Sequence, residues 1–265
     1  MSHPFCTAAV PLAASLLACA AGCGGSTHSS PPISDQLQLS SATPPPASGC
    51  GFDQIRASAA PARGRTAGAP AAGVYRYATS GTLSLAAQNR GASRLPATTE
   101  ALATPVSRAG ALECFGTEHR FGSGTSTVDV YLRRGGDVYA VALGFDTPND
   151  VETVLPRPAI LALSATATRW TGVFGGPTSG SYQFEILGRR AFRVGGRIVE
   201  AVGVSSSASY RGEVTGSRRA TTWLSTDGSL IVAESGVITV DIGVAVDRLA
   251  YSLRLLSPAA VAGAG

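Results

Sequence analysis

Strict alternation of apolar and polar residues is the feature that most constrains how this chain can fold. It is clearest at residues 127–133, 237–246 and 249–255. A period of two with one polar face predicts half-buried antiparallel strands rather than helices. The alternating apolar residues are Val128, Val130 and Leu132 in the first stretch; Ile238, Val240, Ile242, Val244 and Val246 in the second; and Leu249, Tyr251, Leu253 and Leu255 in the third.

Glycine-containing segments separate these predicted strands, at residues 135–137, 188–190, 195–196 and 227–228. Asp227-Gly228 is a typical two-residue hairpin turn. Between Tyr182 and Leu256 the strands therefore follow one another as a meander, and a wide antiparallel sheet must curl or close. Residues 150–155 fit at most one short helical turn. We predict a mainly all-β fold, a single curved antiparallel sheet or open β-barrel of meander topology, with few or no helices.

The N-terminus has the layout of an export signal. Residues 5–21 are apolar and rich in Ala and Leu, and small residues follow them. The segment is too short for a permanent membrane span, so we predict that residues 1–22 are a signal peptide. Residues 1–4 contain no Lys or Arg, although a signal normally begins with positive charge. This departure favours a translation start upstream of Met1.

Ala20-Ala21-Gly22-Cys23 resembles the bacterial lipobox. The resemblance implies a diacylglyceryl group on Cys23, with Leu16-Leu17-Ala18-Cys19 as a competing site at Cys19. Ordinary signal cleavage beyond Cys23 is a further alternative. Two acyl chains are sufficient for stable membrane anchoring. We therefore expect a lipoprotein anchored on the extracytoplasmic side of the cell membrane.

Composition divides the remainder of the chain. Residues 23–49 hold the candidate lipidated cysteine and a Gly-, Ser- and Pro-rich stretch that cannot form a core, which predicts a disordered linker. Residues 50–257 carry the strand patterns and form the predicted β-rich domain. Residues 258–265 are predicted to be a disordered tail.

The five cysteines are explained by these boundaries. Cys6 and Cys19 leave with the signal and Cys23 takes the lipid. Cys50 and Cys114 remain, and an even pair in an oxidising compartment predicts a disulfide. The alternatives are two free thiols, a metal site, or a nucleophilic cysteine with nearby His119 as its base.

Charge and motifs argue against several functions. All 21 basic residues are arginine, but charged residues make up only 14% of the chain, so the electrostatic footprint of a nucleic-acid-binding protein is missing. No phosphate loop, His-Glu-x-x-His motif or Gly-x-Ser-x-Gly elbow occurs in the sequence. We therefore expect a non-enzymatic protein without metal or cofactor, and a hydrolase using unrecognised carboxylates is the less favoured alternative.

Two sets of residues are candidates for binding. Apolar side chains on the concave side of the sheet would face a lipid or other hydrophobic ligand: Val240, Ile242, Leu253 and Leu255. Arginines near predicted turns would form a basic rim at one end of the sheet, facing anionic headgroups or cell-wall polymer: Arg189, Arg190, Arg211, Arg218 and Arg219. Arginines at turns are also common for solubility alone.

Several motifs resemble those of a group of uncharacterised actinobacterial lipoproteins. Gly73-Val74-Tyr75-Arg76-Tyr77 with Thr79-Ser80-Gly81, and then Leu95-Pro96-Ala97-Thr98-Thr99, are similar to the strands that open their domain. The likeness extends over about residues 70–257 and implies the compartment and the β fold, but no catalytic residue.

These observations favour an envelope lipoprotein that binds a hydrophobic ligand in the concavity of its sheet. The alternative is an interaction module that docks on an envelope protein or the cell wall.

Overall fold

The structure of this protein is a computed structural model that describes residue 50, residues 70–86, 91–109, 112–147, 152–226 and 230–241, residue 243, and residues 245–261. The side chains of residues 105–112 and 152–159 are not among those described. The chain separates into two units, Met1–Gln36 and Leu37–Gly265, and every described residue lies in the second. The predicted signal peptide, lipidation sites and linker therefore lie outside the described residues, as do Ile242 and the Asp227-Gly228 turn.

Thirteen strands form one antiparallel sheet. Their bounds are β1 (Gly73–Ser84), β2 (Ser93–Arg94), β3 (Thr98–Ala109), β4 (Leu112–Gly122), β5 (Thr125–Arg134), β6 (Asp137–Asp146), β7 (Glu152–Leu163), β8 (Arg169–Phe174), β9 (Thr178–Val194), β10 (Arg197–Gly212), β11 (Thr215–Ser225), β12 (Ile231–Asp241) and β13 (Val246–Leu255). No helix of the described residues is long and apolar enough to cross a membrane.

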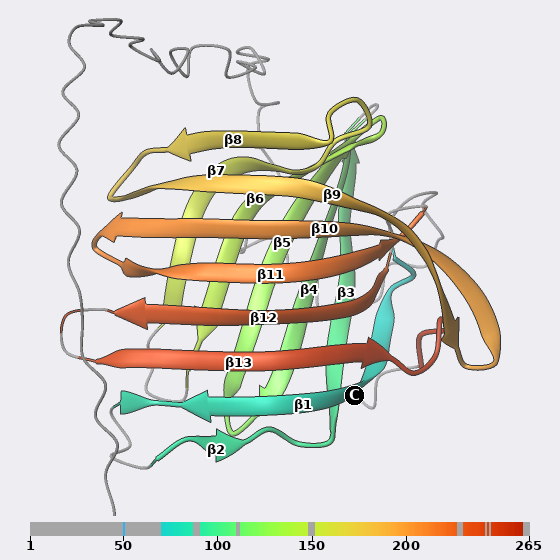
Figure 1. Cartoon of the computed structure of the whole chain (residues 1–265), viewed down its shortest axis with the longest axis horizontal. Coiled ribbons are helices and arrows are strands. Elements are labelled where there is room, and N and C mark those ends of the chain that lie inside the picture. The colour runs from blue at the N-terminus through green and yellow to red at the C-terminus, as the bar shows by residue number, and fades with distance from the viewer. Residues whose placement is uncertain are drawn as a thin grey trace, which may run out of the picture. The chain divides into compact units, whose positions relative to one another are not determined.

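The sheet curls into a nearly closed barrel (Figure 1). Its strand order is β7-β6-β5-β4-β3-β1-β13-β12-β11-β10-β9-β8, with β2 paired to β1 outside this path. Two meanders are joined where β1 pairs with β3 on one side and β13 on the other. At the seam between β7 and β8, the Trp170 indole donates a hydrogen bond to the Leu161 carbonyl at 2.6 Å. The predicted all-β meander and curved sheet are confirmed.

Some of the predicted turns and strand ends are confirmed and others are wrong. Turns occur at residues 135–136 and 195–196, as predicted. The predicted turn at residues 188–190 is wrong, because β9 continues through it and a register shift opposite Gly203 leaves Leu187 unpaired. The predicted strand at 237–246 ends at Asp241, whose carboxylate accepts a hydrogen bond from the Gly243 amide at 2.7 Å. Residues 152–155, predicted as a helical turn, begin β7.

Both surfaces of the barrel wall carry buried apolar clusters. The larger cluster includes Leu249, Leu253 and Leu255 from β13. A smaller cluster on the outer side of β4–β6 contains Cys50, Cys114, Val130 and Leu132. Cys50 and Cys114 form a disulfide there, with 5.9 Å between their Cα atoms.

Strand β5 is buried on both faces, whereas the sequence predicted that one of its faces is exposed to solvent. Val130 and Leu132 pack in the outer cluster, while Asp129 on the opposite face of the strand contacts side chains across the barrel interior. The polar face, expected to be solvated, is therefore the inward one. All of Thr125–Val130 is buried.

The chain remains attached to the domain beyond β13. Val261 forms a backbone bridge with Val74, through hydrogen bonds of 3.2 and 2.9 Å. The ordered domain therefore extends past residue 257, into the segment predicted to be a disordered tail.

Candidate functional site

Charged side chains contact one another inside the barrel, where we expected apolar side chains facing a ligand. The Arg218 guanidinium donates two hydrogen bonds to the Asp129 carboxylate, at 3.0 and 2.9 Å. Its Nη2 also lies 3.6 Å from Oε1 of Glu234. The three side chains are only 14%, 8% and 5% exposed. We call these three residues, with Tyr251, the charge cluster.

Hydroxyl groups satisfy the remaining acceptors of the charge cluster. Thr222 donates to Glu234 at 3.1 Å and Tyr131 donates to Asp129 at 3.1 Å. Tyr251 donates a short hydrogen bond to Glu234. Since Asp129 lies on β5 and the other three members of the charge cluster lie on β11, β12 and β13, the cluster connects the two meanders across the barrel interior.

For both Glu234 and Arg218, burial and ion pairing shift the pKa in opposite directions. Burial raises the pKa of Glu234, although Arg218 and the hydroxyls of Tyr251 and Thr222 oppose this shift. Burial alone would lower the pKa of Arg218, but the nearby acidic groups, Asp129 above all, raise it well above its usual range. Arg218 is therefore a permanent buried cation.

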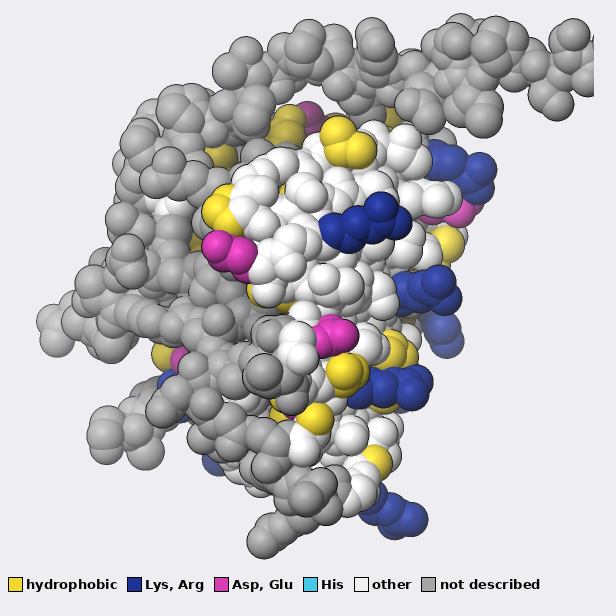
Figure 2. All heavy atoms as spheres, turned by 90° about the vertical axis from the view of Figure 1, so that its left-hand side faces the viewer, with side chains coloured by type: hydrophobic (Ala, Val, Ile, Leu, Met, Phe, Trp, Pro, Cys, Tyr) yellow, Lys and Arg dark blue, Asp and Glu magenta, His cyan; other side chains and the backbone are white. Residues whose placement is uncertain are grey.

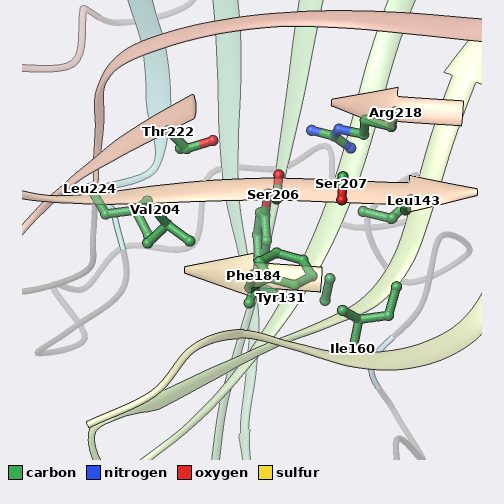
Figure 3. A pocket seen from close by; sticks show the side chains of 13 residues that line it. Tyr131, Leu143, Ile160, Phe184, Val204, Ser206, Ser207, Arg218, Thr222 and Leu224 are labelled. Atoms are coloured by element: carbon green, nitrogen blue, oxygen red, sulfur yellow. The ribbon is translucent and has the colours of Figure 1, made fainter. Parts of the chain in front are cut away.

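A small cavity borders the charge cluster (Figure 3). It measures about 60 Å³, with Arg218 on one side and Ile160 on the other. Its other lining side chains are mostly apolar and include Leu143, Phe184 and Leu224. Sites for drug-sized ligands occupy several hundred Å³, so this cavity has room for a few waters or a short aliphatic group.

The predicted ligand-facing residues do not line this cavity. Val240, Leu253 and Leu255 are at most 4% exposed and pack together in the larger core cluster. The fourth, Ile242, lies outside the described residues. The side chains that were expected to surround a ligand instead fill the barrel.

His119, the histidine of the domain, lies in the barrel interior on β4. Its Nε2 is 2.8 Å from the Thr99 hydroxyl, and its ring packs against Tyr77 and Phe121 at centroid distances of 4.9 and 4.8 Å. Burial lowers the pKa of His119 to about 4. Cys114 is in a disulfide within the outer cluster, so the structure does not bring together the nucleophile and base that were considered as an alternative.

This buried histidine predicts acid sensitivity. The unfolded chain binds a proton on His119 near pH 6.5, whereas the folded protein binds it only near pH 4. Stability should therefore fall by about 3 kcal/mol between pH 6.5 and pH 4 on account of this residue. Urea unfolding at several pH values will measure it, and His119→Phe, which keeps an aromatic ring, should remove this part of the slope. An unchanged slope in the variant would contradict the assignment.

A second hollow lies on the outside of the barrel. This outer groove has a volume of about 610 Å³ and crosses β1, β13, β12, β11 and β10. Small hydroxyl residues paired from strand to strand run along it, and we call them the hydroxyl row: Ser80, Ser252, Ser235, Thr221 and Ser205. Strands are spaced about 4.8 Å apart, so the row is about 20 Å long. Among the described residues that line it, Arg219 is the charged one and none is acidic.

Two glycines keep the wall of the outer groove compact. A Cβ atom at Gly81 would lie 2.0 Å from the Ala250 carbonyl oxygen. A Cβ atom at Gly236 would lie 2.9 Å from the Arg219 carbonyl oxygen. Larger residues would push the neighbouring strands apart, so glycine at both positions preserves the close packing beneath the hydroxyl row.

Exposed arginines surround the outer groove. Arg254 lies in the residue row next to Ser252 on β13, Arg248 lies one row beyond Ala250 on the other side, and Arg219 lies in the groove. None of the three makes an ion pair with a residue that the structure describes. Figure 2 shows arginines gathered along its right-hand edge, which is the outer face that β8–β13 turn toward the viewer in Figure 1.

The five predicted rim arginines do not gather at one end of the sheet. Arg189 and Arg190 pair with Val202 and Ala201 in the interior of the long β9–β10 hairpin. Arg211 is at the far end of β10, and Arg218 is buried in the charge cluster. Arg219 alone of the five lines the outer groove. The predicted turn at 188–190, on which the rim depended, is a strand.

Among the residues that the structure describes, no three His, Cys, Asp or Glu side chains are placed to hold a metal ion.

Comparison with known proteins gives little further information. No family model matches the sequence, and no curated protein matches it. A solved structure described as the hypothetical lipoprotein YmcC from Escherichia coli K12 is similar over 78% of this chain and 96% of its own, with 15% identity and a TM-score of 0.27. A likeness with so low a TM-score carries no argument about the function of this chain. The resemblance to actinobacterial lipoproteins stays a prediction.

Proposed function

We propose that this chain is a non-enzymatic, lipid-anchored envelope protein that binds an anionic glycan in its outer groove. The observation that carries the proposal is the coincidence, in the outer groove, of the hydroxyl row with Arg219. The lipidation motif at Cys23 supports the anchored location, and the filled barrel interior supports an exterior binding site.

The chemistry of the outer groove suits a sugar polymer with acidic groups. Serine and threonine hydroxyls both donate and accept hydrogen bonds, as sugar hydroxyls do. Arginine pairs with carboxylates or phosphates by two parallel hydrogen bonds. A row of about 20 Å can contact several successive sugar units of an extended chain.

A hydrophobic ligand inside the barrel is the second candidate function. The mostly apolar lining of the interior cavity, with Leu143, Ile160 and Leu224, favours it. Its volume of about 60 Å³ weighs against it, because a whole acyl chain would have to displace core side chains. The exterior groove, at about 610 Å³, is therefore the better-supported site.

Binding of polygalacturonate, a carboxylate-bearing glycan, tests the proposal, with neutral dextran as the comparison. We expect the full chain to bind polygalacturonate more tightly than dextran, in a salt-dependent manner, by isothermal titration calorimetry. Ser235→Glu places a like charge in the hydroxyl row and should weaken binding at least about tenfold. Arg219→Ser removes one exposed cation and should weaken it up to about fivefold.

Arg134→Ser is the matched control, because Arg134 is an exposed arginine at the end of β5, remote from the outer groove. It should leave the dissociation constant unchanged. Equal affinity for dextran and polygalacturonate, or full binding by Ser235→Glu, would reject the proposed site. Native mass spectrometry showing a bound lipid in the purified chain would favour the second candidate instead.

A further inference from the structure

The β9–β10 hairpin extends well beyond its neighbours. These strands have 17 and 16 residues, and β10 is in register with β11 only from Ala201 onward. Toward the turn, residues 197–199 pair with β9 alone, while the Glu200 carbonyl still accepts a hydrogen bond from the Thr226 amide at 3.0 Å. We call residues 187–200 the hairpin arm. It bends along the end of the sheet in Figure 1, and Gly195 at its turn lies against Leu256 and Pro258.

One face of the hairpin arm fixes it to the barrel. Phe192 and Val194 are buried in the larger core cluster, with Val199 packed against it. The Arg190 guanidinium lies over the rings of Phe192 and Trp223, at 5.2 and 5.9 Å from their centroids. These contacts hold the arm in one position, so its other face is presented as a preformed surface.

The exposed face of the hairpin arm combines positive charge with apolar side chains. Ile198 is 60% exposed and lies directly across the hairpin from Arg193, while Leu187 is 48% exposed. Two exposed arginines, Arg189 and Arg193, share this face with Ile198, Arg197 is exposed beside the turn, and Glu200 is the single acidic residue of the arm. None of these arginines makes an ion pair with a described residue.

We infer that the hairpin arm docks on the surface of an anionic lipid bilayer. Arginines next to protruding aliphatic side chains match an interface with negative headgroups above an apolar layer, because the guanidinium binds phosphate while the aliphatic group enters the acyl boundary. A soluble anionic polymer would use the arginines but leave Ile198 and Leu187 in water. The docking would set the orientation of the domain on the membrane, independently of what fills the outer groove.

Vesicle co-sedimentation tests this surface in the absence of acylation. The full chain carrying Cys19→Ser and Cys23→Ser is mixed with vesicles of phosphatidylglycerol and phosphatidylcholine in equal parts, or of phosphatidylcholine alone. We expect salt-sensitive binding to the anionic vesicles only. Adding Arg189→Glu and Arg193→Glu, the two arginines that share a face with Ile198, should weaken partitioning at least about twentyfold. Ile198→Ser should weaken it about fivefold.

The matched control reverses two exposed arginines elsewhere, Arg94→Glu with Arg134→Glu, and should bind anionic vesicles as the parent does. Equal loss in this control would show a net-charge effect and overturn the assignment, as would full binding by the arm variants. Binding that survives Ile198→Ser but is abolished by free polygalacturonate would assign the arm to soluble polyanions instead. The arm variants should retain polygalacturonate binding in the outer groove, and Ser235→Glu should retain vesicle binding, so the two proposals fail separately.

Discussion

Arg218→Met should lower the free energy of unfolding by about 3–5 kcal/mol, because it leaves two buried carboxylates without their cation. Asp129 loses both hydrogen bonds from the guanidinium, and Glu234 loses its nearby positive charge. Methionine keeps the aliphatic part of the arginine side chain and removes the charged group, so the effect is largely electrostatic. Urea unfolding followed by tryptophan fluorescence measures the change.

Neutralising the partners should reverse much of this loss. The triple variant Arg218→Met with Asp129→Asn and Glu234→Gln contains no buried charge in the charge cluster, and we expect it to recover at least half of the lost stability. The loss in Arg218→Met should also shrink as the pH is lowered, because the unpaired carboxylates can then take up protons. A loss below about 1 kcal/mol at neutral pH would show that the pair is largely solvated.

Removing the Cys50–Cys114 disulfide should have a comparable effect. The bond closes a loop with a sequence separation of 64, for which the chain-entropy model gives about 4 kcal/mol of stabilisation. We expect Cys50→Ala with Cys114→Ala to lose that amount in urea unfolding, with little change in the native fold, because both side chains pack in an apolar cluster that alanine tolerates.

Chemical reduction separates the crosslink from the packing. Wild-type protein treated with dithiothreitol should unfold at nearly the same urea concentration as the double alanine variant. The single variant Cys114→Ala should match both, because one thiol cannot form the bond. If reduction left the unfolding midpoint unchanged, the loop closure would contribute nothing to stability.

The sequence predicted the fold class because strand periodicity and turn chemistry agree along the second meander. In β13 the alternation at Leu249, Tyr251 and Leu253 corresponds directly to buried positions. The prediction was wrong at Gly188, because a glycine followed by two arginines is typical of a turn and equally of a bulge inside a long hairpin. Only the pairing of β9 with β10 distinguishes the two.

The interior of the barrel was much less predictable. Asp129 alternates with valines, and an acidic residue in such a pattern is normally solvated. Its burial depends on Arg218, which lies across the barrel on a strand distant in the sequence. No local sequence pattern indicates this contact between Asp129 and Arg218. The predicted disulfide is the one sequence feature that points to burial on both faces of β5. It places Cys50 against Cys114 on the outer side of the sheet, opposite Asp129.

The outer groove was missed for a related reason. Ser80, Ser205, Thr221, Ser235 and Ser252 are scattered through the sequence, and each is unremarkable in its own strand. They become a row only through the registers of four strand pairs. The predicted arginine rim included Arg219 because it lies near a predicted turn, but its neighbours in space are residues of other strands.

The pairing of β1 with β13 places the two ends of the domain in adjacent strands. During synthesis from the N-terminus, β1 lacks its partner β13 until nearly all of the domain has been made. The contacts that join the two meanders then span almost the whole length of the domain, which predicts slow folding. Premature termination before residue 246 would leave β1 and β12 as two open edges, each free to pair with another chain.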